Sequence, residues 1–84
     1  MKTILVIEDN EDIRENVVEM LTLSDYNLLE AANGRIGIEM AQQHKPDLII
    51  CDIMMPGIDG YGVLHVLRKD PVTQNIPFIF LTSK

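Results

Sequence analysis

Four short apolar runs alternate along this chain with longer segments in which apolar residues recur at helical spacing. The runs lie at residues 3–7, 26–31, 47–51 and 77–82. The first is continuous and rich in β-branched residues, as expected for a strand that is buried on both faces of a sheet. Residues 48–51 are expected to form the buried core of the third strand. Because strands that alternate with helices are typical of parallel sheets with right-handed crossovers, the sequence predicts an α/β fold.

An apolar stripe marks each helical segment. The stripes are Ile13, Val17, Met20 and Leu21 in the first segment, Ile36, Met40 and Ala41 in the second, and Val63, Leu64 and Leu67 in the third. Asn10 is the expected N-cap of the first helix, and the second helix is expected to stop near His44, before Pro46. Gly37 lies inside the second helix, and we expect it to weaken that helix by about 1 kcal/mol relative to alanine.

Length and charge limit the kind of protein that this chain forms. The 84 residues leave room for one small domain. The 13 acidic residues outnumber the 7 Lys and Arg residues, and the net charge of −6 argues against nucleic-acid binding by this chain alone. The single cysteine, Cys51, excludes an intrachain disulfide. Every apolar run is far shorter than the roughly 20 residues of a membrane span, so we expect a cytoplasmic protein without membrane contact.

Acidic side chains follow two of the expected strands, at the point where each strand ends. Glu8 and Asp9 come directly after the first strand, Asp52 follows the third, and Thr82 ends the fourth. Ligands of parallel α/β sheets bind at the carboxyl ends of the strands, so three carboxylates and a hydroxyl converge if the first and third strands are neighbours. Carboxylates held close together repel one another unless a cation neutralises them. Oxygen ligands without a nearby His or Cys cluster favour Mg²⁺.

Each of these acids also has a simpler explanation. Glu8 and Asp9 suit the positive N-terminal end of the following helix, and Asp52 suits a turn that ends a strand. The three together favour a binding site, because burial of three like charges without a ligand is costly. A carboxylate beside Mg²⁺ is able to attack a phosphoryl group and to form an acyl phosphate.

Three blocks of the sequence resemble the receiver domain of two-component response regulators. They are the Glu8-Asp9 pair, the segment Lys45–Gly60 with the sequence KPDLIICDIMMPGIDG, and the FLTS sequence at residues 80–83. The blocks follow one another in the family's order, and the resemblance covers the whole chain. It implies a flavodoxin-like open parallel sheet with strand order 2-1-3-4. It also implies a signalling switch, which receives a phosphoryl group from a sensor histidine kinase in the presence of Mg²⁺.

The resemblance assigns a role to each residue of the expected site. Asp52 would accept the phosphoryl group, Asp9 would bind Mg²⁺ directly, and Glu8 would bind it through water. Met54 would add its backbone carbonyl to the metal, and Thr82 would be the hydroxyl that turns toward the phosphoryl group. A chain of this kind is not an enzyme beyond its own phosphorylation and dephosphorylation.

The family pattern continues beyond the residues present here, with a fifth strand and two more helices. That fifth strand carries a lysine that binds the phosphoryl group, and Lys84 follows Thr82 too closely to take this role. Residues 1–84 are therefore expected to form the amino-terminal part of a receiver domain, incomplete at its C-terminus. The fourth strand would then be an open edge, through which we expect the chain to self-associate.

Two other functions stay open on the sequence alone. One is a Mg²⁺-dependent phosphotransferase or phosphatase with an aspartyl nucleophile; such enzymes usually carry a second acid two residues after the nucleophile, where this chain has Met54. The other is an interaction module or folding fragment that is not phosphorylated, for which the missing lysine is the best support. Phosphorylation by a small-molecule donor distinguishes these functions.

Overall fold

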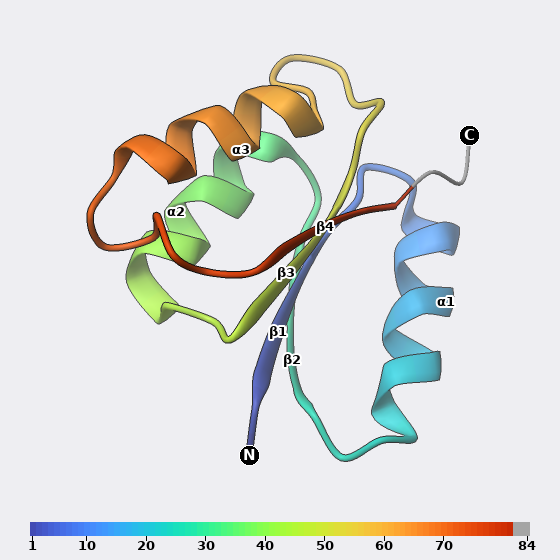
Figure 1. Ribbon diagram of the computed structural model, residues 1–84. Coiled ribbons are helices and arrows are strands. Elements are labelled where there is room, and N and C mark those ends of the chain that lie inside the picture. Colours follow the sequence, from blue (N-terminus) through green and yellow to red (C-terminus); the bar gives the residue numbers. More distant parts are fainter. Residues whose placement is uncertain (82–84) are drawn as a thin grey trace.

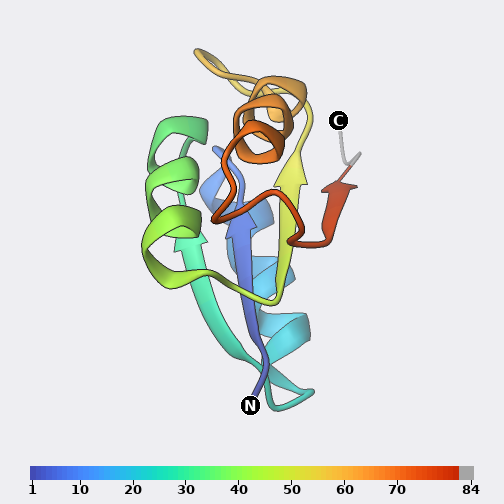
Figure 2. The ribbon, with the colours of Figure 1, turned by 60° about the vertical axis from the view of Figure 1, so that its left-hand side comes forward.

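Four parallel strands and three helices alternate in the computed structural model, which describes residues 1–81. The elements are β1 (Thr3–Ile7), α1 (Glu11–Thr22), β2 (Asn27–Ala31), α2 (Gly34–His44), β3 (Leu48–Asp52), α3 (Gly60–Lys69) and β4 (Phe78–Leu81). The strands pair in the order β2-β1-β3-β4, side by side in Figure 2. This order confirms the predicted α/β class and the strand order 2-1-3-4. Thr82, the expected last residue of the fourth strand, lies outside the described residues.

The main hydrophobic core lies between the sheet and the pair α2 and α3. Figure 1 shows these two helices on one face of the sheet and α1 on the other. Alternate residues of a strand point to opposite faces, so every second residue of β1 and β3 enters this core. Its buried members are Leu5, Ile7, Ala31, Ile38, Ala41, Ile49, Cys51, Met55, Val63 and Leu67. Five of the six stripe residues of the second and third helical segments lie in this core or pack against it, as predicted. The sixth, Leu64, is half-buried outside the core.

The face of the sheet that carries α1 is covered less completely. This helix contacts β1 and β2. On β3, Leu48 and Ile50 are only half-buried, and on β4 Ile79 is 53% exposed. The prediction that residues 48–51 are buried throughout is therefore wrong for the two that point toward α1, since that helix lies over the other half of the sheet.

The buried side of α1 agrees with the predicted stripe except at Met20. Ile13, Val17 and Leu21 are half-buried, as predicted, and so are Arg14 and Val18. Met20, placed on the stripe by its spacing, is 70% exposed, because the inward side of the helix extends toward Arg14 and Val18 instead. No residue of α1 is fully buried.

A side chain caps the N-terminus of each helix, at Asn10 as predicted and also at Asn33 and Asp59. Asn10, Asn33 and Asp59 each accept a hydrogen bond from the backbone N–H three residues further on, at 3.0, 2.9 and 2.8 Å. These contacts satisfy N–H groups that lack a partner within the helix. The second helix ends at His44, as predicted, and Lys45 follows with a left-handed φ of 49°. None of the helices in the described part of the chain is long and apolar enough to cross a membrane.

Gly37 has a packing role that its helix propensity conceals. A Cβ atom at this position would lie 2.5 Å from Cδ1 of Ile7 on β1, closer than any side chain tolerates. The expectation that Gly37 weakens the second helix considers that helix alone. In the folded chain, the absence of a side chain lets α2 approach the centre of the sheet.

Candidate functional site

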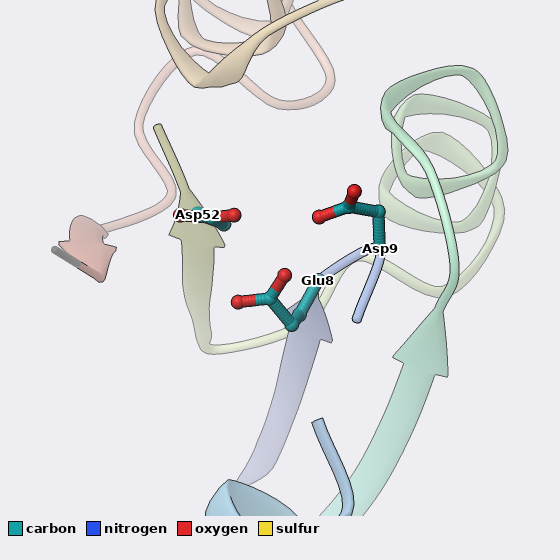
Figure 3. A group of neighbouring side chains, drawn as sticks. All are labelled: Glu8, Asp9 and Asp52. Atoms are coloured by element: carbon teal, nitrogen blue, oxygen red, sulfur yellow. The ribbon is translucent and has the colours of Figure 1, made fainter. Parts of the chain in front are cut away.

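The carboxyl ends of β1 and β3 bring three carboxylates together. These strands are neighbours, with Ile7 paired to Cys51, so the residues that follow them meet at one edge of the sheet. One carboxylate oxygen from each of Glu8, Asp9 and Asp52 lies within 4.8 Å of the other two. Figure 3 shows the three side chains facing a common space. The strand-end pattern predicts this convergence from the sequence.

The three carboxylates differ in their access to solvent. Glu8 is 0% and Asp52 is 1% exposed, while Asp9 is half-buried at the mouth of the group. Removal of carboxylates from water weakens the screening between them and raises the free energy of the charged forms. The group consequently has a strong electrostatic preference for a cation.

The size and chemistry of the group suit Mg²⁺. Carboxylate oxygens are the ligands that this ion prefers, at about 2.1 Å, so opposite ligands lie about 4.2 Å apart. The oxygens of the three acids lie within 4.8 Å of one another, close to that span. They fit an ion of this size that keeps part of its water shell.

Hydrogen bonds hold Glu8 in place at three points. Its N–H donates to the carbonyl of Ala31 at 3.1 Å, and its carboxylate Oε2 accepts from the N–H of Asn10 at 3.0 Å. Its carbonyl accepts from Nη1 of Arg14 at 2.8 Å. Arg14 is not predicted from the sequence, because a charged residue on a helix usually faces solvent. The available signal is its position beside Ile13, on the inward side of the helix.

The loop after Asp52 is fixed by the first residue of α3. The N–H of Gly60 donates to the carbonyl of Ile53 at 2.9 Å. Met54, two residues beyond Asp52, is 65% exposed, so its side chain lies in solvent. A role of Met54 at the metal therefore depends on its backbone carbonyl alone, as the resemblance implies. Thr82 lies outside the part of the chain that the structure describes.

Cys51 lies beside the site, but its thiol is unreactive. The side chain is 0% exposed within the core. Burial raises the pKa of the Cys51 thiol to about 12, and the negative charges of Asp52, Glu8 and Asp59 add to the rise. The thiol is protonated at neutral pH and acts as a small apolar side chain.

The family is decided by comparison with known proteins. The model of the response regulator receiver domain matches residues 4–84. This chain belongs to the response regulator receiver domain family. The match extends over all three sequence blocks on which the resemblance was based, and it makes the chain a phosphoacceptor domain of two-component signalling.

Individual relatives of this receiver domain include both response regulators and kinases. Protein PilH of Pseudomonas aeruginosa is 37% identical over 84 residues, which cover 100% of this chain and 69% of PilH. Histidine kinase P4 of Formosa agariphila is 42% identical over 82 residues, which cover 98% of this chain and only 6% of that kinase. The chain therefore corresponds to one small part of the larger relative.

A solved relative carries a metal ion. The receiver domain of sensor histidine kinase PA1611 from Pseudomonas aeruginosa is 30% identical and superposes with a TM-score of 0.89, over 99% of this chain and 68% of that one. Its structure holds a magnesium ion coordinated in the active-site cleft. The same fold thus places a magnesium site in a receiver domain.

Proposed function

We propose that this receiver domain accepts a phosphoryl group on Asp52 from a sensor histidine kinase, with Mg²⁺ bound beside it. The observation that carries the proposal is the convergence of the Glu8, Asp9 and Asp52 carboxylates at the carboxyl ends of β1 and β3. Asp9, the most exposed of the three, is the proposed direct ligand, and the buried Glu8 is proposed to act through water. Asp52 itself and the backbone carbonyl of Met54 complete the proposed protein ligands. The magnesium ion in a solved relative supports this assignment.

Asp52 is the proposed nucleophile because of its place in the sheet. It is the last residue of β3, paired with Leu81 of β4, so the backbone on which it stands is fixed. One of its oxygens attacks phosphorus; a P–O bond forms, the P–N bond of the donor imidazole phosphate breaks, and the imidazole nitrogen retains the electron pair. Bound Mg²⁺ supplies positive charge for the phosphoryl oxygens.

The residues around Asp52 favour a lasting signal over catalytic turnover. Hydrolysis of an acyl phosphate is accelerated by a second acid or base that positions water. Met54 stands two residues beyond Asp52 and offers no such group. The alternative of a phosphatase or phosphotransferase therefore lacks a catalytic side chain at that position, and we propose that this chain is a switch rather than an enzyme.

Three further expectations belong to this proposal. Thr82 is the proposed switch hydroxyl, by resemblance to the family. A cytoplasmic location suits a partner kinase that delivers its phosphoryl group there. Self-association through β4 is favoured by the position of this strand at the end of the described sheet and by the exposure of Ile79.

Intact mass measurement tests the proposal directly. The chain is incubated with acetyl phosphate and MgCl₂, and one added phosphoryl group is expected. Asp52→Asn should abolish the gain. Asp47→Asn is the matched control, since Asp47 precedes the same strand at its other end, where its carboxylate accepts from the N–H of Thr3 at 2.8 Å.

The other two functions give different results in the same experiment. Release of phosphate over many turnovers supports the enzyme, and Mg²⁺ binding without phosphorylation supports the interaction module. A phosphoryl group retained in Asp52→Asn refutes the assignment of the nucleophile.

A further inference from the structure

Arg14 joins three elements and contacts the backbone of the acidic group. Its side chain is 15% exposed, although it belongs to a helix without fully buried residues. The guanidinium Nη1 donates to the carbonyl of Glu8 at 2.8 Å, and Nε donates to Oε1 of Glu30 at 3.2 Å. One side chain of α1 is thereby tied to the end of β1 and to β2.

We propose that Arg14 is a positioning residue, which sets the direction of the Glu8 and Asp9 carboxylates for cation binding. This inference rests on the proposed function, since it concerns the same metal site. It extends that function to a residue that contacts neither the metal nor the phosphoryl group. Arg14 contacts the backbone that carries the proposed metal ligands.

The hydrogen bond from Arg14 to the Glu8 carbonyl affects the side chains of both Glu8 and Asp9. That carbonyl belongs to the peptide unit between Glu8 and Asp9, and a peptide unit is planar. A hydrogen bond that fixes this plane restricts ψ of Glu8 and φ of Asp9, and so restricts the directions of both side chains. The backbone N–H of Arg14 also donates to the carbonyl of Asn10 at 3.0 Å, so Arg14 holds the β1–α1 connection on both sides of Asp9.

Glu30 explains why this role requires arginine. A guanidinium is planar and donates in two directions at once, toward a carbonyl and toward a carboxylate, whereas lysine has a single flexible ammonium. The Glu30 side chain is 45% exposed on β2, where it orients the guanidinium and offsets its charge. This neutralisation by Glu30 matters because an unpaired positive charge on Arg14 would repel the cation and weaken its binding to the acids.

A simple charge effect predicts the opposite result from positioning. If Arg14 acted only by its charge, its removal would strengthen Mg²⁺ binding, because like charges repel. If Arg14 positions the acids, its removal weakens Mg²⁺ binding despite the lost repulsion. The sign of the change in dissociation constant therefore distinguishes the two.

Isothermal titration calorimetry with MgCl₂ at fixed ionic strength measures whether the Mg²⁺ dissociation constant rises or falls in Arg14→Met and Arg14→Lys. We expect the Mg²⁺ dissociation constant to rise about tenfold in Arg14→Met, as for other residues that orient metal ligands, and to rise also in Arg14→Lys, which keeps the charge. A second readout needs no metal: amide hydrogen exchange at Asp9 and Asn10 should accelerate in both variants. Arg14→Lys decides the matter if Arg14→Met does not fold.

Arg68→Met is the matched control. Nη1 of Arg68 donates to the carbonyls of Gln74 and Ile76, both at 2.9 Å, in the loop that leads into the far end of β4. This variant loses the same charge and comparable backbone contacts away from the acidic group, so its Mg²⁺ affinity should be unchanged.

The outcomes separate this inference from the proposed function. Arg14 variants that bind Mg²⁺ as tightly as the wild type, or more tightly, overturn the positioning role alone. A wild-type chain that binds no Mg²⁺ overturns the proposed function and the inference with it.

Discussion

Gly60 lies against the main-chain carbonyl of Asp52, and no side chain fits between them. A Cβ atom at Gly60 would lie 2.4 Å from that carbonyl oxygen and 2.9 Å from Cα of Ile53. Both contacts are with backbone, which cannot rotate away as a side chain does. The first residue of α3 therefore fixes the position of the backbone that carries the proposed nucleophile and Met54.

Gly60→Ala is expected to disturb the site as well as the fold. Separation of α3 from β3 should lower the free energy of unfolding by about 1–3 kcal/mol, the usual cost of overpacking. The shift of the Asp52–Met54 backbone should also slow phosphorylation by acetyl phosphate. Urea unfolding and intact mass measure the two effects.

Gly62→Ala supplies the control for this prediction. A Cβ atom at Gly62, in the same helix, meets Cγ2 of Ile58 at 2.9 Å, which is part of a side chain that is able to rotate. Alanine also favours the helix over glycine by about 1 kcal/mol. Phosphorylation of Gly62→Ala at the wild-type rate is expected, and a loss equal to that of Gly60→Ala would contradict the role of the Gly60 contact.

Gly37→Ala should destabilise the protein although alanine is the better helix former. The new methyl group would meet Cδ1 of Ile7 at 2.5 Å and Cγ1 at 2.8 Å. Ile7 is 0% exposed in the core, unlike the 37% exposed Ile58, so its side chain has no room to rotate away, and we expect a loss of about 1–3 kcal/mol in the free energy of unfolding. Ile7→Val removes Cδ1, so the double variant should lose less than the sum of the two single losses. Strict additivity in urea unfolding would show that the two residues do not compete for the same space.

Local sequence patterns predict much of this fold, and the features that they do not predict depend on tertiary contacts. The strand positions and the convergence of Glu8, Asp9 and Asp52 follow from apolar runs and from the rule that parallel strands end at one edge of the sheet. The exposure of Met20 does not follow, because spacing marks the centre of a helical stripe, whereas tertiary contacts decide which residues at its margins face the sheet.

Two residues have roles that depend on tertiary contacts and that a sequence pattern does not show. Gly37 is unfavourable in an isolated helix, and its benefit depends on Ile7, 30 positions away, which only the folded chain brings near. Arg14 is charged, and burial of its side chain depends on Glu30 and on a backbone carbonyl. Helical periodicity does not reveal contacts with residues of other elements, so the sequence predicts neither the role of Gly37 nor that of Arg14.

Asp9→Asn is expected to have opposite effects on stability without and with magnesium. In metal-free buffer, removal of one negative charge relieves repulsion with both Glu8 and Asp52 and should stabilise the fold by about 2 kcal/mol, because each pair of unit charges about 4 Å apart in water repels by about 1 kcal/mol. In MgCl₂ at about 100 times the wild-type dissociation constant, the wild type gains about 2.7 kcal/mol, which the variant lacks. Thermal unfolding in both buffers should therefore show a reversed order of Tm.

Cys51 should resist alkylation in the folded protein. Its side chain is 0% exposed, and the thiol pKa of about 12 leaves it protonated at pH 8, whereas thiolate is the reactive form. Iodoacetamide at pH 8 should modify Cys51 only after urea unfolds the chain, as followed by intact mass. Rapid modification without urea would show that the core around Cys51 opens readily.

Ile79 should carry much of the self-association that we expect of this chain. In the described sheet β4 pairs only with β3, so its outer backbone groups are available to another strand, and Ile79 is 53% exposed beside the half-buried Ile50. Lysine on an edge strand opposes such pairing by its charge. Ile79→Lys should therefore raise the dimer dissociation constant at least about tenfold, or about 1.4 kcal/mol, in sedimentation equilibrium.

The matched control for this surface is Val72→Lys. Val72 is 50% exposed in the loop before β4, so the substitution adds the same charge in place of an equally exposed apolar residue. If association depends on the strand edge, Val72→Lys should dimerise as the wild type does. A net-charge effect would act in the opposite direction, because either lysine lowers the net charge from −6 toward neutral and so reduces the repulsion between two chains. If Val72→Lys weakens association as much as Ile79→Lys does, the interface is therefore not at the strand edge. A wild-type chain that is monomeric at all concentrations would remove the edge as an interface.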